Sequence, residues 1–97
     1  MALKIVWTTQ AEKGLEKVID YLEKEWSEKE ILKFEKQLNN LLTRISKYPK
    51  TCPPTKHYKH LRKGSVGKHN YIIYRINFDR GIIELINLRG SKQRPMY

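Results

Sequence analysis

The stretch from Lys68 to Ile76, Lys-His-Asn-Tyr-Ile-Ile-Tyr-Arg-Ile, limits the possible folds of this chain more than any other part of the sequence. Its aromatic and β-branched residues favour a β-strand, in which successive side chains point to opposite faces. The face that can be buried carries Asn70, Ile72, Tyr74 and Ile76. The opposite face carries His69, Tyr71, Ile73 and Arg75. An imidazole, a phenol and a guanidinium therefore share one face, and such groups can hold a phosphate or transfer a proton.

The length and the cysteine content indicate the class of protein. With 97 residues the chain is long enough for one domain with a modest core and too short for two, so we expect a single domain over residues 1–97. Cys52 is the only cysteine and has no partner, which predicts a reduced, cytoplasmic environment. The sequence shows neither a secretory signal nor an apolar run that could span a bilayer, so we expect no membrane contact.

The positive charge is concentrated in the second half of the chain. The net charge is +10. Residues 1–48 contain nine Lys or Arg against eight Asp or Glu, whereas residues 49–97 contain eleven against two. All three histidines and four of the six tyrosines also lie in the second half. This mixture indicates a surface that meets a polyanion or an acidic partner, although a solvated basic face would also account for the charge.

The first half predicts a short strand followed by two amphipathic helices. Residues 3–7 are an apolar strand candidate. Thr9-Gln10-Ala11-Glu12 has the spacing of a capping box, which predicts that a helix starts at Thr9. Ser27-Glu28-Lys29-Glu30 repeats this pattern, and Pro49 ends the second helix. Because few residues separate the two helices, we expect an antiparallel helical hairpin with a shared apolar surface.

The second half predicts a loop and a small antiparallel sheet. Three prolines indicate a surface loop over residues 49–55. We expect a first strand over residues 58–63, a turn over 64–67, a long strand over 68–78, a hairpin loop over 79–81 and a last strand over 82–88. The last strand is apolar on both faces except at Glu84 and Asn87, which favours a position in the middle of the sheet.

Together these elements predict an α+β fold. It consists of an N-terminal strand, an α-helical hairpin and a three-stranded antiparallel β-meander, with both helices packed on one face of the sheet. The other face stays open and, with the basic tail, would form the concave site. His57 and His60 are three residues apart and lack a third ligand, so we expect no metal and no other cofactor.

Several stretches, taken in order, carry a resemblance to a known family. The chain has a β-α-α-β-β-β order, a Trp7-Thr8-x-x-Ala11 start, the 68–76 strand, a long apolar strand and a closing Lys92-Gln93-Arg94-Pro95. In these features, over nearly its whole length, it resembles the RelE/ParE superfamily of toxins from bacterial type II toxin–antitoxin modules. The resemblance implies a small basic toxin that a co-expressed antitoxin neutralises, and it leaves the oligomeric state open.

The resemblance implies one of two kinds of target. RelE-type members are ribosome-dependent endoribonucleases that cut mRNA, whereas ParE-type members share the fold and poison DNA gyrase. Cleavage of RNA without a metal needs a base, a cation for the charge on the phosphorane and an acid for the leaving oxygen. For a RelE-type function the candidate catalytic residues are Arg62, His69, Tyr71, Arg75, Lys92 and Tyr97.

Departures from the RelE pattern favour the ParE branch. Where RelE-type chains carry an arginine early in the long strand, this chain has Tyr71, and the arginine expected near the end of the last strand falls at Ser91 or Lys92. The closing stretch resembles the Arg-Gln-x-Pro ending of ParE-like chains, with a lysine that keeps the charge but loses the bidentate fork. We therefore expect gyrase as the target. The alternatives are an mRNA endoribonuclease and a non-toxic RNA- or antitoxin-binding module.

Two further sets of residues are candidates for binding macromolecules. On the basic face and the tail, the expected contacts with the target are Lys63, Lys68, Arg89 and Arg94. If the helical hairpin leaves part of its apolar stripe exposed, an antitoxin helix would contact Leu38, Leu42 and Ile45.

Some of the candidates also have a simpler structural explanation. Tyr74 shares its face with isoleucines, so we expect it in the core. Arg75 either pairs with Asp79 or Glu84 or binds an external anion. His69 either transfers protons or is an ordinary surface histidine.

Overall fold

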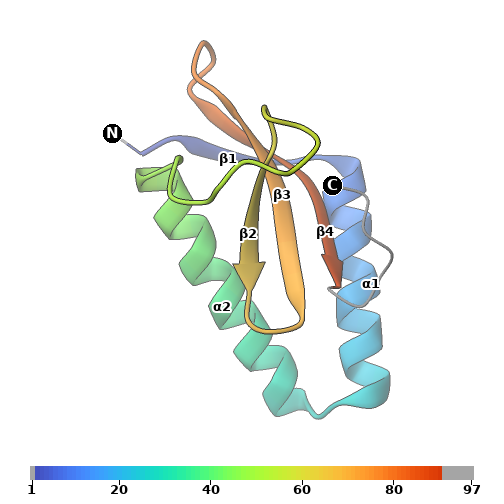
Figure 1. Ribbon diagram of the computed structural model, residues 1–97. Helices are drawn as coiled ribbons and strands as arrows, with labels where there is room; N and C mark the ends of the chain where they lie inside the picture. Colours follow the sequence, from blue (N-terminus) through green and yellow to red (C-terminus); the bar gives the residue numbers. More distant parts are fainter. Residues whose placement is uncertain (1, 91–97) are drawn as a thin grey trace.

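The computed structural model describes residues 2–90, which form a four-stranded sheet with two helices packed against one face (Figure 1). In chain order the elements are β1 (Lys4–Trp7), α1 (Thr9–Glu25), α2 (Glu28–Lys47), β2 (Arg62–Val66), β3 (Asn70–Asn77) and β4 (Ile82–Gly90). The strands lie in the order β1-β4-β3-β2, with β1 parallel to β4 and the other neighbours antiparallel. This arrangement confirms the predicted α+β fold and the inner position of the last strand.

The two helices begin close to the predicted positions, but their caps differ. Thr8, not Thr9, caps α1: its Oγ1 accepts a hydrogen bond from the amide of Ala11 at 3.2 Å and donates one to the carbonyl of Leu85 at 2.6 Å. The second bond reaches β4, so a tertiary contact favours Thr8 over Thr9 as the cap of α1. Ser27 precedes α2 as predicted, yet its side chain makes no capping hydrogen bond.

Among residues 2–90, no helix combines the length and the apolar character needed to cross a bilayer.

The prediction placed the first strand of the meander too early. β2 begins at Arg62, and the residues before it form a loop in which the amide of Thr55 donates to the carbonyl of Leu61 at 2.7 Å. The β2–β3 turn lies at residues 67–69, where Gly67 adopts a φ of +66°. Lys68 and His69 therefore belong to the turn, and β3 begins only at Asn70.

Gly64, which the prediction assigned to the turn, lies inside β2 for a steric reason. A Cβ atom at this position would lie 2.9 Å from Sγ of Cys52 and 3.2 Å from a methyl group of Leu41. Cys52 belongs to the loop and Leu41 to α2. The absent side chain therefore lets the loop and α2 pack closely against β2.

The alternation predicted for the long strand is confirmed. Ile72 and Tyr74 are buried in the main core between the sheet and the helices, and that core also includes Phe34 and Leu85. The hydroxyl of Tyr74 donates to the carbonyl of Pro49 at 2.7 Å. Burial raises the pKa of this phenol well above its usual range, so it stays protonated and donates at neutral pH.

The opposite face of the sheet, which we call the outer face, is not as open as predicted. Tyr71 and Ile73 are only 6% and 0% exposed, and with Leu61 they form a second, smaller cluster against which Ile86 packs. Leu61 comes from the loop before β2. This loop covers part of the outer face. The prediction that the face stays open as a concave site is therefore wrong.

Helix α1 lies very close to β4 at Gly14. A Cβ atom on this glycine would lie 2.3 Å from the carbonyl oxygen of Leu88 and 3.1 Å from the side-chain oxygen of Asn87. The nearer atom belongs to the backbone and cannot rotate away. Glycine at this position therefore sets the distance between α1 and the sheet.

We predict that Gly14→Ala destabilises the protein, although alanine favours helix over glycine by about 1 kcal/mol. The new methyl group must push α1 away from β4, and such overpacking costs about 1–3 kcal/mol. Urea unfolding gives the change in the free energy of unfolding. Glu16→Ala, at an exposed position of the same helix, is the control and should change it by less than about 0.5 kcal/mol. A Gly14→Ala variant as stable as the parent would contradict this explanation.

Candidate functional site

Arg75 is exposed on the outer face and paired within the chain. Its Nε and Nη2 donate to Oε1 of Glu84 at 3.0 and 2.8 Å. The two residues are direct neighbours across β3 and β4. Of the two alternatives for Arg75, the structure therefore shows the internal ion pair.

The phenol ring of Tyr71 lies beneath a lysine. Nζ of Lys63 is 4.4 Å from the centroid of this ring, at a distance typical of a cation–π interaction. Arg89 is the direct neighbour of Tyr71 on β4. Two of the expected target contacts, Lys63 and Arg89, are thus brought to either side of Tyr71 on the outer face, and this group of three is called the outer basic patch.

Arg62 points to the other side of the sheet. It is the cross-strand neighbour of Tyr74, whose side chain is in the main core, and directly opposite side chains share a face. Nη1 of Arg62 donates to the carbonyl of Cys52 at 2.6 Å. Arg62 and Tyr74 together therefore fix the loop between α2 and β2 against the edge of the sheet.

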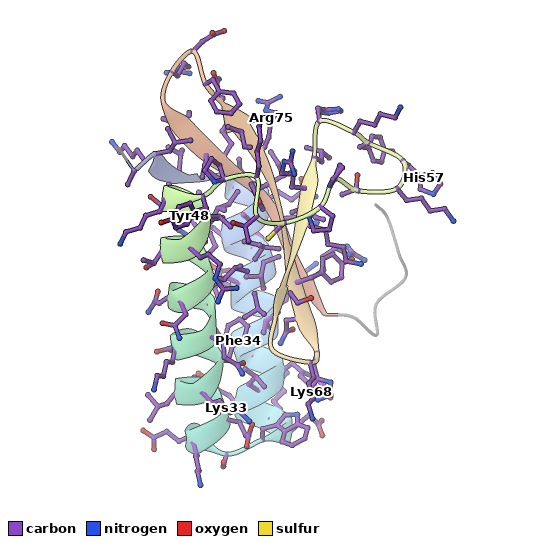
Figure 2. All side chains as sticks on the ribbon, turned by 60° about the vertical axis from the view of Figure 1, so that its left-hand side comes forward. Lys33, Phe34, Tyr48, His57, Lys68 and Arg75 are labelled. Carbon is purple, nitrogen blue, oxygen red and sulfur yellow. The ribbon has the colours of Figure 1, made fainter. Side chains whose placement is uncertain are left out.

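His69 lies in the β2–β3 turn, far from Arg62 and Arg75. The imidazole stacks on Trp26 at the end of α1, with ring centroids 6.5 Å apart and planes at 28°. Arg75 is six positions after His69, which corresponds to roughly 20 Å along an extended strand. Figure 2 shows Lys68, the sequence neighbour of His69, at the opposite end of the sheet from Arg75.

The structure therefore does not bring the candidate catalytic residues together. Arg62 is on the helix side, Tyr71 and Arg75 are on the outer face, and His69 is in the β2–β3 turn. The remaining candidates of both sets, Lys92, Arg94 and Tyr97, lie outside the described residues.

The residues expected to contact an antitoxin helix do not form an open groove. Leu38 and Ile45 are 5% and 0% exposed and belong to the main core, and Leu42 is partly buried against it. These leucine and isoleucine side chains face the sheet because the apolar stripe of α2 is used for folding. The prediction of an exposed stripe is wrong at Leu38 and Ile45, whereas a contact between Leu42 and an antitoxin stays a prediction.

The sequence did not predict a pocket of about 530 Å³ at the end of the helical hairpin, between both helices and the β2–β3 turn. Its apolar lining includes Val18, Leu22, Trp26, Phe34 and Val66, and its polar lining includes Lys17, Lys33, Lys68 and His69. Figure 2 shows Lys33, Phe34 and Lys68 at this end of the molecule. We call this cavity the hairpin pocket. A tryptophan directly before the predicted helix break is the one sequence feature that could have indicated it.

Comparison with known proteins identifies the family. The sequence model of a family described as the ParE toxin of the type II toxin–antitoxin system, parDE, matches residues 5–95. The chain belongs to this family. The match confirms the resemblance to the RelE/ParE superfamily and supports the ParE branch. A search of curated protein sequences gave no match to this ParE-family chain.

A solved structure supports the fold of this ParE-family toxin. It is a chain of the toxin–antitoxin complex RelBE2 from Mycobacterium tuberculosis, with a TM-score of 0.66 and 14% sequence identity. The alignment covers 94% of this chain and 100% of that chain. At so low an identity the likeness concerns the fold.

We predict that Arg62→Ala lowers the stability of this ParE-family toxin by about 1–2 kcal/mol, because the loop loses the charged hydrogen bond to Cys52. Chemical denaturation measures the change. Lys59→Ala removes an equal charge from an exposed position of the same loop and should have an effect below about 0.5 kcal/mol. Equal stability of the two variants would mean that Arg62 does not anchor the loop.

Proposed function

We propose that this ParE-family toxin stops growth by binding DNA gyrase and that a cognate antitoxin neutralises it. Gyrase and the alternative target, the ribosome, are both cytoplasmic, so the proposal requires a cytoplasmic toxin. The contact surface would be the outer basic patch, where Lys63 and Arg89 flank the buried ring of Tyr71, with Arg94 of the tail as a further candidate.

The separation of the candidate catalytic residues is the observation that carries this proposal. Metal-free cleavage of RNA needs a base, a cation and an acid around one phosphate. Here Arg62 holds the loop, Arg75 is paired with Glu84, and His69 lies at the far end of the sheet. Three groups in separate places support binding of a target more than chemistry on it.

The proposal of an antitoxin partner rests on the family and on charge. The family is that of toxins from toxin–antitoxin systems, and the similar solved structure is described as a toxin–antitoxin complex. A toxin with a net charge of +10 attracts acidic partners over long distances, which raises the rate of association. We therefore expect an antitoxin with acidic segments.

The alternative is a ribosome-dependent mRNA endoribonuclease. Lys63 and Arg89 beside Tyr71 are the feature that favours it, because two cations near a phenol resemble a site for a phosphate. In that case Lys92 and Tyr97 would complete the site. A non-toxic module that binds RNA or an antitoxin is the second alternative.

Inducible expression in bacteria tests the target. Once growth stops, we expect DNA breaks and an SOS response with intact mRNA. The double variant Lys63→Ala/Arg89→Ala should weaken inhibition of purified gyrase by about tenfold or more, because two charged contacts are lost. The double variant Lys56→Ala/Lys59→Ala makes the same change of charge at exposed loop positions and should inhibit as the parent does.

Separate variants test the alternative. If the protein were a nuclease, mRNA would be cut on ribosomes, and Tyr97→Phe or His69→Ala would abolish both the cuts and the growth defect. Such a result would replace gyrase with mRNA as the target. Normal growth on expression of the parent, with the protein present at full level, would favour the non-toxic module.

A further inference from the structure

The hairpin pocket has an apolar floor at the end of the molecule away from the anchored loop. Val18 and Leu22 of α1, Phe34 of α2 and Val66 of β2 line it, and each is less than a tenth exposed. The volume of about 530 Å³ is in the range of pockets that hold small ligands or single large side chains. The floor therefore suits a ligand group with apolar faces.

Two aromatic rings form one wall of the pocket. Trp26 is 49% exposed, and its ring stacks at 28° from parallel with the imidazole of His69. The two rings come from different elements, the end of α1 and the β2–β3 turn. Exposed aromatic faces are the surfaces on which nucleic acid bases stack, whatever the base.

Charged and amide groups surround this wall. Lys17, Lys33 and Lys68 supply three ammonium groups, and Glu30 supplies the single carboxylate among the described residues that line the pocket. The excess of positive charge selects an anionic ligand. Asn70 also lines the pocket, and its amide can both donate and accept hydrogen bonds, as the edge of a base requires.

We propose that the hairpin pocket binds a nucleotide unit, either a free nucleotide or one within a single strand of nucleic acid. The base stacks on the half-exposed ring of Trp26, beside His69, and the phosphate is held by Lys33 and Lys68. An acidic peptide with an apolar anchor would meet the same charges. The rings of Trp26 and His69 favour a base over a peptide side chain. Any nucleic acid base stacks on an aromatic ring, whereas aromatic side chains contact each other edge to face as readily as in a stack. This proposal goes beyond the target of the toxin, because it concerns binding by the purified chain alone.

NMR titration of the full-length protein tests the proposal. The probes are adenosine monophosphate, adenosine without phosphate, a short single-stranded oligoadenylate and a glutamate-rich peptide that contains one tryptophan. We expect both phosphorylated probes to shift the indole N–H of Trp26 and the amides of Lys68 and His69, and adenosine to bind at least about tenfold more weakly than the monophosphate. Stronger binding of the oligonucleotide would indicate a single strand as the natural ligand, and equal binding a free nucleotide.

Variants of exposed residues test which side chains bind the base and the phosphate, and one of these variants is the control. Trp26→Ala should weaken nucleotide binding by about tenfold or more, and Trp26→Phe should restore most of it. Lys33→Ala/Lys68→Ala should weaken binding and reduce its salt dependence, whereas Lys56→Ala/Lys59→Ala, with the same net charge, should bind as the parent does. Circular dichroism confirms that each variant is folded.

Three results would overturn the proposal. The first is the absence of shifts at Trp26 and His69 with either phosphorylated probe at millimolar concentration. The second is an equal loss of binding in both double-lysine variants, which would mean attraction to the total charge. The third is a response of the pocket to the acidic peptide alone, which would make it a peptide site.

Discussion

The packing of Tyr74 is the interaction on which most of this structure depends. Its ring lies in the main core between the sheet and the helices, and its hydroxyl holds the carbonyl of Pro49 directly after α2. With the bond from Arg62 to Cys52, it fixes the loop that follows. That loop then covers Tyr71 and Ile73 on the outer face through Leu61. One buried phenol thus connects the core on one side of the sheet with the cover on the other.

This arrangement explains why the basic half of the chain contains less free charge than its composition indicates. Arg62 is used by the loop, Arg75 by Glu84, and Lys63 lies over an aromatic ring. A guanidinium whose N–H groups already donate within the fold has fewer donors left for a substrate. Two places where positive charge gathers next to aromatic rings are the outer basic patch and the rim of the hairpin pocket.

The sequence predicted the features that depend on local periodicity. The alternation in β3, the apolar stripes of both helices and the inner position of β4 are all visible in the structure. The sequence-based prediction was wrong or silent where contacts between residues distant in the sequence determine the structure. Gly64 and Gly67 look alike in sequence, but one is needed for close packing against Cys52 and the other for a positive φ. The hairpin pocket combines residues from both helices and a turn, and no single stretch contains its pattern.

The parallel pairing of β1 with β4 has a consequence for synthesis of the toxin. The hydrogen bond from Thr8 to Leu85 joins residues that are 77 positions apart, and the strand that lies between β1 and β3 is the last described strand to be translated. A nascent chain can form the helical hairpin early, because its contacts are local. The sheet has to wait until β4 has left the ribosome. Until then the outer basic patch lacks Arg89, so the surface proposed to bind the target is complete only in a chain that includes β4.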